Sequence, residues 1–139
     1  MRQREAVIWR QAHFDDLTQL PNRQMFQESL LSTIEFSRRE QKIFALVFLD
    51  LDFFKEVNDT FGHDEGDELL RQVASRLQSC VRSTDLVARL GGDEFVLILH
   101  NTKSREDIFS ICKKVLENIS KPYNLTNNIV NISVSAGIT

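Results

Sequence analysis

The chain has 139 residues, with 17 Lys and Arg against 20 Asp and Glu, so its formal net charge is −3. Apolar residues make up 42% and charged residues 27%, which is typical of a single globular domain with one core. The acidic balance argues against non-specific nucleic-acid binding, which needs a basic surface.

No stretch is long and apolar enough to cross a membrane or to act as a secretory signal. The longest apolar run, residues 43–49, is far short of the roughly 20 residues that a membrane helix needs. The apolar residues 6–9 lie between charged neighbours. The two cysteines, Cys80 and Cys112, match no metal or redox spacing. We therefore expect reduced thiols and a cytoplasmic location.

Hydrophobic periodicity and turn residues predict the elements of the first half of the chain. In order, they are a helix over 1–14, a break over 15–21, a helix capped by Asn22 and ending near Arg38, a strand over 43–49, a short helix over 53–57, a turn over 58–62 and a long helix from Asp64. The strand is uniformly apolar and bounded by charges, which is typical of a strand buried on both faces.

The second half predicts a hairpin, a helix and a last strand. Strands over 85–90 and 95–99 flank the turn residues Gly91, Gly92 and Asp93. Ser104 with Asp107 forms a capping box for a helix that Pro122 ends, and a half-buried strand follows over 130–136. A hairpin beside a strand, with helices on one face, indicates an α/β (α+β) sheet of ferredoxin-like or palm type.

Acidic residues follow the first strand and occupy the hairpin tip. The period of a strand places Asp50 and Asp52 on one face with the Leu51 carbonyl between them, and Asp93 and Glu94 lie at the tip. Carboxylates and a main-chain carbonyl form the hard oxygen site that Mg²⁺ takes when it also holds substrate phosphates. The alternative is a solvated strand end and an acidic turn.

Phe53, Phe54 and Lys55 follow this acidic pair. If a helix begins there, its free N–H groups form an anion site, and Lys55 adds a positive charge for phosphates. Core phenylalanines beside a surface lysine are the alternative. Gly91 and Gly92 can adopt positive φ and leave room for a ligand. The alternative is a plain hairpin turn, which also favours glycines because of their positive φ.

Two further groups of polar residues allow recognition of a guanine base. Asn58 and Asp67, near His63, have the amide and carboxylate groups that pair with a guanine edge, while capping and turn chemistry is the alternative. Arg82 and Asp85 have RxxD spacing, and an Arg can fork onto guanine O6 and N7. A surface ion pair is the simpler interpretation of RxxD.

Taken together, these motifs resemble the GGDEF domains of diguanylate cyclases. Residues 16–23 (DLTQLPNR) look like the family's DxLTxLPNR motif, and residues 50–59 (DLDFFKEVND) and 61–67 (FGHDEGD) look like its DxDxFKxxND and GHxxGD stretches. The signature Gly91-Gly92-Asp93-Glu94-Phe95 is unaltered. The resemblance covers residues 15–139, which leaves 1–14 as a linker or signalling helix.

The resemblance implies a reaction and a role for each site residue. Two GTP would condense into cyclic di-GMP with release of two pyrophosphates, on a sheet like that of class III nucleotide cyclases. Asp50, the Leu51 carbonyl and Asp93 would hold Mg²⁺ or Mn²⁺, and Asp93 would help to deprotonate the ribose 3′-hydroxyl. For the substrate, phosphates would bind near Phe53 and Phe54, and Lys55 would stabilise their charge. Asn58 and Asp67 would recognise the guanine base, and His63 would line the same site. Arg82 and Asp85 would form an inhibitory site for the product.

The resemblance also implies partners. Each domain holds one GTP and the product needs two, so a two-fold homodimer with facing half-sites is expected. An upstream sensor and a downstream EAL-type phosphodiesterase domain are common companions, in a bacterial protein that can be membrane-bound. A regulatory domain that binds GTP or cyclic di-GMP without turnover is the alternative, and a polymerase palm is a third reading that the acidic charge disfavours.

The sequence departs from the family at its C-terminal end. Residues 135–139 (SAGIT) resemble the family's SxGIA segment, after which members continue through a helix and a strand that carry a Lys and an Arg of the triphosphate clamp. We therefore expect these 139 residues alone to have weak or no cyclase activity.

Overall fold

The structure, a computed structural model, describes residues 2–102 and 104–139. In chain order the elements are α1 (Gln3–His13), α2 (Arg23–Glu40), β1 (Ile43–Leu51), α3 (Phe54–Phe61), α4 (His63–Cys80), β2 (Leu86–Gly91), β3 (Glu94–Thr102), α5 (Arg105–Ile119), β4 (Tyr123–Asn124), β5 (Ile129–Val130) and β6 (Val134–Ile138).

Four of the strands form one antiparallel sheet in the order β2-β3-β1-β6. The strands β4 and β5 form a separate small hairpin. In the central strand β1, Asp50 lies opposite Glu94 of β3 on one side and opposite Ser135 of β6 on the other. The antiparallel, palm-type sheet that the sequence predicts is therefore confirmed.

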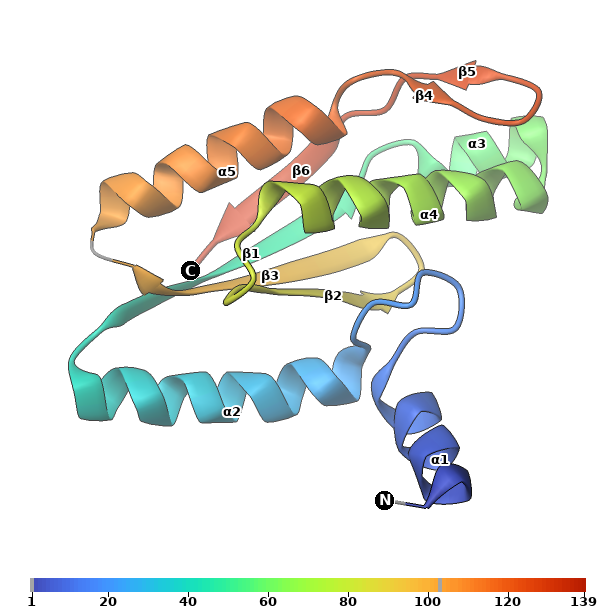
Figure 1. Cartoon of the computed structure of the whole chain (residues 1–139). Helices are drawn as coiled ribbons and strands as arrows, with labels where there is room; N and C mark the ends of the chain where they lie inside the picture. Colours follow the sequence, from blue (N-terminus) through green and yellow to red (C-terminus); the bar gives the residue numbers. More distant parts are fainter. Residues whose placement is uncertain (1, 103) are drawn as a thin grey trace.

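Helices cover both faces of this sheet, with α4 and α5 above it and α2 below it (Figure 1). The larger core fills the space under α4 and α5, and its fully buried residues include Leu69, Leu77, Leu97, Val115 and Ile119. A second core joins Phe26 of α2 to Ala88, Val96 and Ile98. The expectation that the helices pack on one face is thus wrong, because the apolar stripe of α2 buries itself against the opposite face.

The central strand is not buried on both faces as its apolar sequence predicts. Ala45, Val47, Leu49 and Leu51 point into the larger core, but Phe48 on the other face is 40% exposed. The reason is that α2 lies mainly against β2 and β3. Buried residues of β1 therefore alternate with more exposed ones from Ala45 to Leu51.

Two other boundaries differ from the expectation. The turn expected over 58–62 is the second half of α3, and the chain reverses at Gly62, whose φ of 94° suits glycine. The single strand expected over 130–136 is divided between β5 and β6, because β5 pairs with β4 instead of joining the main sheet. The predicted caps are confirmed, since Asn22 accepts from the Met25 N–H and Ser104 from the Asp107 N–H.

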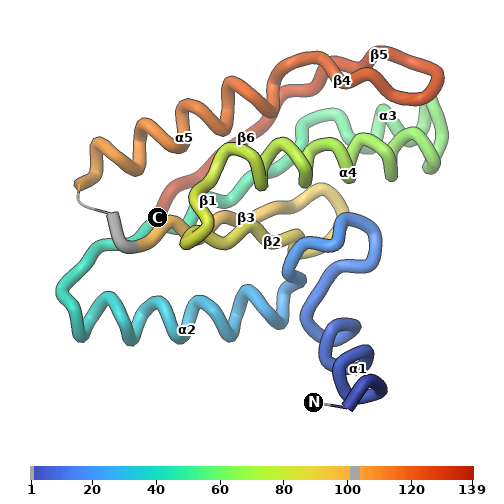
Figure 2. The backbone as a smooth tube through the Cα atoms, viewed as in Figure 1, coloured from blue at the N-terminus to red at the C-terminus, as the bar shows by residue number. Residues whose placement is uncertain are grey.

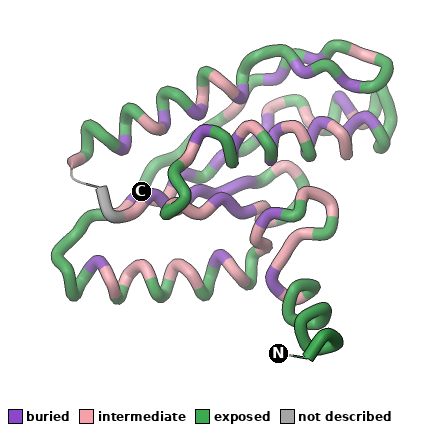
Figure 3. Tube along the Cα trace, viewed as in Figure 1, coloured by how far each residue is buried: buried purple, intermediate pink, exposed green. Residues whose placement is uncertain are grey.

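The N-terminal helix α1 extends away from the sheet and contacts α2 (Figures 1 and 3). Its apolar residues Val7, Ile8 and Trp9 are exposed. Among the described residues, no helix is long and apolar enough to cross a membrane. Cys80 and Cys112 are both buried and free.

Candidate active site

The acidic residues of the sequence motifs meet at one corner of the sheet. Asp50 and Leu51 are the last residues of β1, and Asp93 occupies the turn between β2 and β3. The N–H of Leu51 donates to the carbonyl of Asp93 at 3.3 Å, which ties the strand end to the turn. Glu94 lies directly across from Asp50. The structure therefore brings together the three residues predicted to hold a metal.

The negative charges at this corner act on one another. Burial raises the pKa of Asp93, and the charges of Asp50 and Glu94 raise it further. A cation between these carboxylates would relieve that repulsion. In residues 2–102 and 104–139, no three His, Cys, Asp or Glu side chains group to enclose a metal. Two carboxylates with the Leu51 carbonyl fit Mg²⁺, which keeps several of its positions for water and phosphate oxygens.

Asp52 has a different role from the one that its spacing to Asp50 predicts. The chain leaves β1 after Leu51, and the two carboxylate oxygens of Asp52 accept hydrogen bonds from the hydroxyls of Ser133 and Ser135, at 2.9 and 2.8 Å. The Asp52 N–H also donates to the Ser133 carbonyl at 3.0 Å. Asp52 thus attaches β6 to the end of β1, and its oxygens are already in use.

The residues after Asp52 form the expected helix start beside the acidic corner. Phe53 adopts a left-handed φ of 67° and its side chain is 66% exposed, so it is not a core residue, whereas Phe54 packs on the larger core. A left-handed conformation is strained for a bulky residue and is often found at functional sites. The N–H groups at the start of α3 have no side-chain cap, and Lys55 is exposed in its first turn. This arrangement leaves backbone donors available to an anion.

The glycine turn that carries Asp93 is held from one side by Arg89. Gly91 and Gly92 have φ of 143° and 52°, so this turn requires residues without a Cβ. The Nε and Nη2 of Arg89 donate to the Gly92 carbonyl at 3.0 and 2.8 Å. Its Nη1 donates to both carboxylate oxygens of Asp15 at 3.1 Å. The sequence motifs did not single out Arg89.

Asp15 anchors the loop 15–21, which runs beside the glycine turn in Figure 2. Its carboxylate accepts from the N–H and the hydroxyl of Thr18, at 2.8 and 2.7 Å, in addition to Arg89. The first carboxylate of the DxLT pattern is therefore Asp15 and not Asp16. Counting three residues back from Thr18 would have found it in the sequence.

The candidate guanine residues lie on α3 and at the start of α4, two helices that contact each other at the same end of the molecule as the glycine turn (Figure 1). Asn58 is on α3, while His63 and Asp67 are one helical turn apart on α4. His63 is exposed and Asp67 is half-buried. The Oδ1 atom of Asn58 is buried and has no hydrogen-bond partner among the described residues.

Arg82 and Asp85 lie at the opposite end of β2 from the glycine turn. The Nε and Nη2 of Arg82 donate to the two carboxylate oxygens of Asp85 at 3.0 and 2.8 Å, and Nη2 also donates to the His100 carbonyl at 2.8 Å. The hydrogen bonds with Asp85 raise the pKa of Arg82, and the negative charges of Asp85 and Asp107 add to this. The carboxylate of Asp85 is fully covered, so the ion pair expected as the simpler interpretation is present. The Arg82 side chain remains 42% exposed beside a cavity of about 270 Å³.

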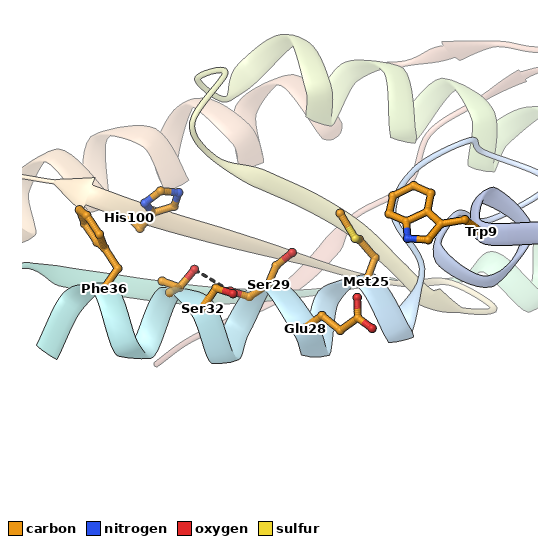
Figure 4. Close-up of a pocket in the computed structure, with 8 residues that line it drawn as sticks. Trp9, Met25, Glu28, Ser29, Ser32, Phe36 and His100 are labelled. Atoms are coloured by element: carbon orange, nitrogen blue, oxygen red, sulfur yellow. Dashed lines mark hydrogen bonds between the residues drawn. The ribbon is translucent and has the colours of Figure 1, made fainter. Parts of the chain in front are cut away.

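Two hollows flank the sheet on the α2 side. One, of about 380 Å³, is lined by Asp50 and Glu94 together with Arg23 of α2, a cation that the motifs did not assign to the site. The other, of about 520 Å³, is a groove along α2 between Trp9, Phe36 and His100 (Figure 4). The groove contains none of the predicted site residues, whereas the hollow of 380 Å³ is lined by Asp50 and by Glu94 of the signature turn.

Comparison with known proteins agrees with this geometry. The sequence profile described as diguanylate cyclase, GGDEF domain, matches residues 12–139. The chain is 44% identical over 124 residues to the bifunctional diguanylate cyclase/cyclic di-GMP phosphodiesterase MucR of Pseudomonas aeruginosa, which covers 89% of this chain and 18% of MucR. It is 37% identical to the diguanylate cyclase TpbB of the same organism, over 99% of this chain and 32% of TpbB. The chain therefore spans a third or less of these two relatives.

Solved structures give the same result. The GGDEF domain of TpbB superposes with a TM-score of 0.87 at 38% identity, over 91% of this chain and 74% of that one. The coiled coil and GGDEF domain of DgcB from Caulobacter crescentus, solved with c-di-GMP, gives a TM-score of 0.90 at 28% identity, over 99% of this chain and 73% of that one. On the profile match, these relatives and the intact signature turn, the chain belongs to the GGDEF diguanylate cyclase domain family.

Proposed function

We propose that this domain is a diguanylate cyclase domain, in which two GTP molecules condense into cyclic di-GMP and two pyrophosphates are released. The observation that carries the proposal is the acidic corner of Asp50, Leu51 and Asp93, which lies beside the uncapped start of α3. A donor set for a divalent cation next to free backbone N–H groups suits a nucleoside triphosphate.

Different residues of the chain bind the metal ion, bind the phosphates and accept the proton. Asp50, the Leu51 carbonyl and Asp93 would hold Mg²⁺ or Mn²⁺, which when bound neutralises phosphate charge and favours ionisation of the attacking 3′-hydroxyl. The N–H groups near Phe53 and Phe54 hold phosphate oxygens, and Lys55 stabilises the charge of the transferring group. Asp93 also takes up the proton that the 3′-hydroxyl loses.

Base recognition and assembly complete the proposal. Asn58 and Asp67 bind the guanine edge, and His63 lines the same site. Each domain contributes one half-site, so the reaction takes place in a homodimer in which each GTP attacks the α-phosphate of the other.

Arg82 and Asp85 bind cyclic di-GMP and slow turnover, which requires that the Arg82–Asp85 pair open toward the ligand. Because GTP is a cytoplasmic nucleotide, the domain works in the cytoplasm, alongside sensor or phosphodiesterase domains.

The experiment is a cyclisation assay on the natural full-length protein that contains these residues. GTP and Mg²⁺ are added, and cyclic di-GMP is resolved by chromatography for the unchanged protein and for Asp93→Ala. We expect product from the first and none from the second. Binding of cyclic di-GMP without any synthesis would contradict the enzyme proposal and favour a regulatory domain, for which the exposed Arg82 guanidinium is the supporting observation.

A further inference from the structure

Gly66 differs from the other glycines of the chain in what surrounds it. A Cβ built at Gly66 would lie 1.7 Å from Oδ1 and 2.9 Å from Cγ of Asn58. At Gly62, Gly91, Gly92 and Gly137, a built Cβ meets no atom within 4 Å. The three atoms nearest to that Cβ position all belong to the side-chain amide of Asn58.

The backbone of Gly66 does not itself require glycine. Positive φ values occur at Gly62, Gly91 and Gly92, while Gly66 lies within α4 with ordinary helical geometry. Glycine is unfavourable inside a helix compared with alanine, because it loses more conformational freedom on folding. The helix thus contains an unfavourable residue at a position where a methyl group would collide with Asn58.

The contact fixes the amide of Asn58. The atom facing Gly66, Oδ1, is buried without a hydrogen-bond partner among the described residues, and Nδ2 lies 3.6 Å from the position of the missing Cβ. Rotating the amide by half a turn would exchange oxygen and nitrogen, but one of the two atoms would still occupy the space above Gly66. The Oδ1 end of the amide is therefore seated against α4, and this contact sets where the Nδ2 end lies relative to that helix.

We infer that Gly66 is a positioning residue for the Asn58 amide, and that it thereby sets the preference of the nucleotide site for guanine over adenine. This inference rests on the proposed GTP-binding function. It deepens that proposal because Gly66 has no side chain to touch the base and acts only through the space that it leaves for Asn58.

The test uses four versions of this chain: unchanged, Gly66→Ala, Asn58→Ala and the double variant. Calorimetry with GTP and with ATP, each with Mg²⁺, gives the ratio of the two dissociation constants. We expect Gly66→Ala to weaken GTP binding about tenfold, the equivalent of one lost hydrogen bond, and ATP binding less than about twofold. A general disturbance of the fold would weaken both nucleotides alike. Ser75→Ala, at an exposed position of α4, is the control for a change in helix propensity.

The double variant distinguishes the inference from the proposed function. Since Asn58→Ala removes the atoms that a methyl group would strike, adding Gly66→Ala to it is expected to change neither the GTP/ATP ratio nor folding. If Gly66→Ala alone does not fold, the double variant should fold, and failure of both would overturn the inference.

Two results on GTP binding distinguish a failure of the Gly66 inference from a failure of the proposed function. Normal GTP binding by Gly66→Ala with weak binding by Asn58→Ala would overturn the inference and leave the proposed function intact. Normal GTP binding by Asn58→Ala would overturn the role of Asn58 in the proposed function, and the inference with it.

Discussion

Replacing Arg89 with alanine should destabilise the domain substantially, although this residue belongs to no expected ligand set. The substitution removes four hydrogen bonds, two to the Gly92 carbonyl and two to the carboxylate of Asp15. The side chains of Arg89 and Asp15 are only 13% and 20% exposed. Breaking a fully buried ion pair costs about 3–5 kcal/mol, and the remaining exposure lowers this to about 2–4 kcal/mol.

Urea unfolding of the chain measures this loss. Arg39→Ala is the matched control, because Arg39 pairs with Glu40 at the surface, where the side chains are 67% and 49% exposed. An exposed pair of this kind contributes less than about 1 kcal/mol. With Asp15→Ala, a double-mutant cycle should give a coupling energy of about 1–3 kcal/mol. If Arg89→Ala lost no more stability than Arg39→Ala, the bridge between the loop 15–21 and the glycine turn would have no energetic role.

The same bridge predicts a dependence on pH. Burial raises the pKa of Asp15, but hydrogen bonds from Thr18 and the charge of Arg89 more than compensate, so its pKa lies below the usual 3.8. The stabilisation by this carboxylate is therefore present above pH 3.8 and is lost as the pH falls through the lower folded value. In Arg89→Ala the pKa should rise, and NMR titration of the Asp15 carboxyl would show it. An unchanged titration would contradict the bridge.

Three further variants test separate parts of the site. Asp93→Ala should abolish cyclic di-GMP synthesis but leave cyclic di-GMP binding intact in calorimetry; loss of both would contradict two separate sites. Arg82→Ala should keep the enzyme active at product concentrations that silence the parent, and unchanged inhibition in a progress-curve assay would refute the product-site assignment. Phe53→Gly should raise the free energy of unfolding by up to about 1 kcal/mol. Glycine adopts the left-handed conformation without strain, and the Phe53 side chain that is lost buries little surface. A lower melting temperature of this variant would argue against strain at Phe53.

Local chemistry explains which parts of the fold the sequence could predict. Helix periodicity and the caps Asn22 and Ser104 depend on neighbouring residues, and the structure confirms them. The half-exposed β1 and the division of the last strand depend on where α2 and β4 lie, which no local pattern contains. The uniformly apolar run 43–49 therefore correctly predicts a strand, but it wrongly predicts that both faces of this strand are buried.

The same distinction applies to the site. Asp50, Leu51 and Asp93 could be named because they belong to two short motifs, and the structure brings them together. Arg89 meets Asp15 across 74 positions of sequence, so their pairing is visible only after folding. The contact between Asn58 and Gly66 likewise joins two helices across a reversal of the chain at Gly62.

We expect a divalent cation and GTP to bind together at the corner of Asp50, Leu51 and Asp93. Paramagnetic Mn²⁺, titrated with GTP into the isotope-labelled chain, broadens the NMR signals of nearby amides. We expect selective broadening of the Leu51 and Asp93 amides, loss of this broadening in Asp93→Ala, and sharp signals at Asp85 beyond the far end of β2. Broadening centred on Asp85, or none at Leu51 and Asp93 with GTP bound, would contradict this expectation.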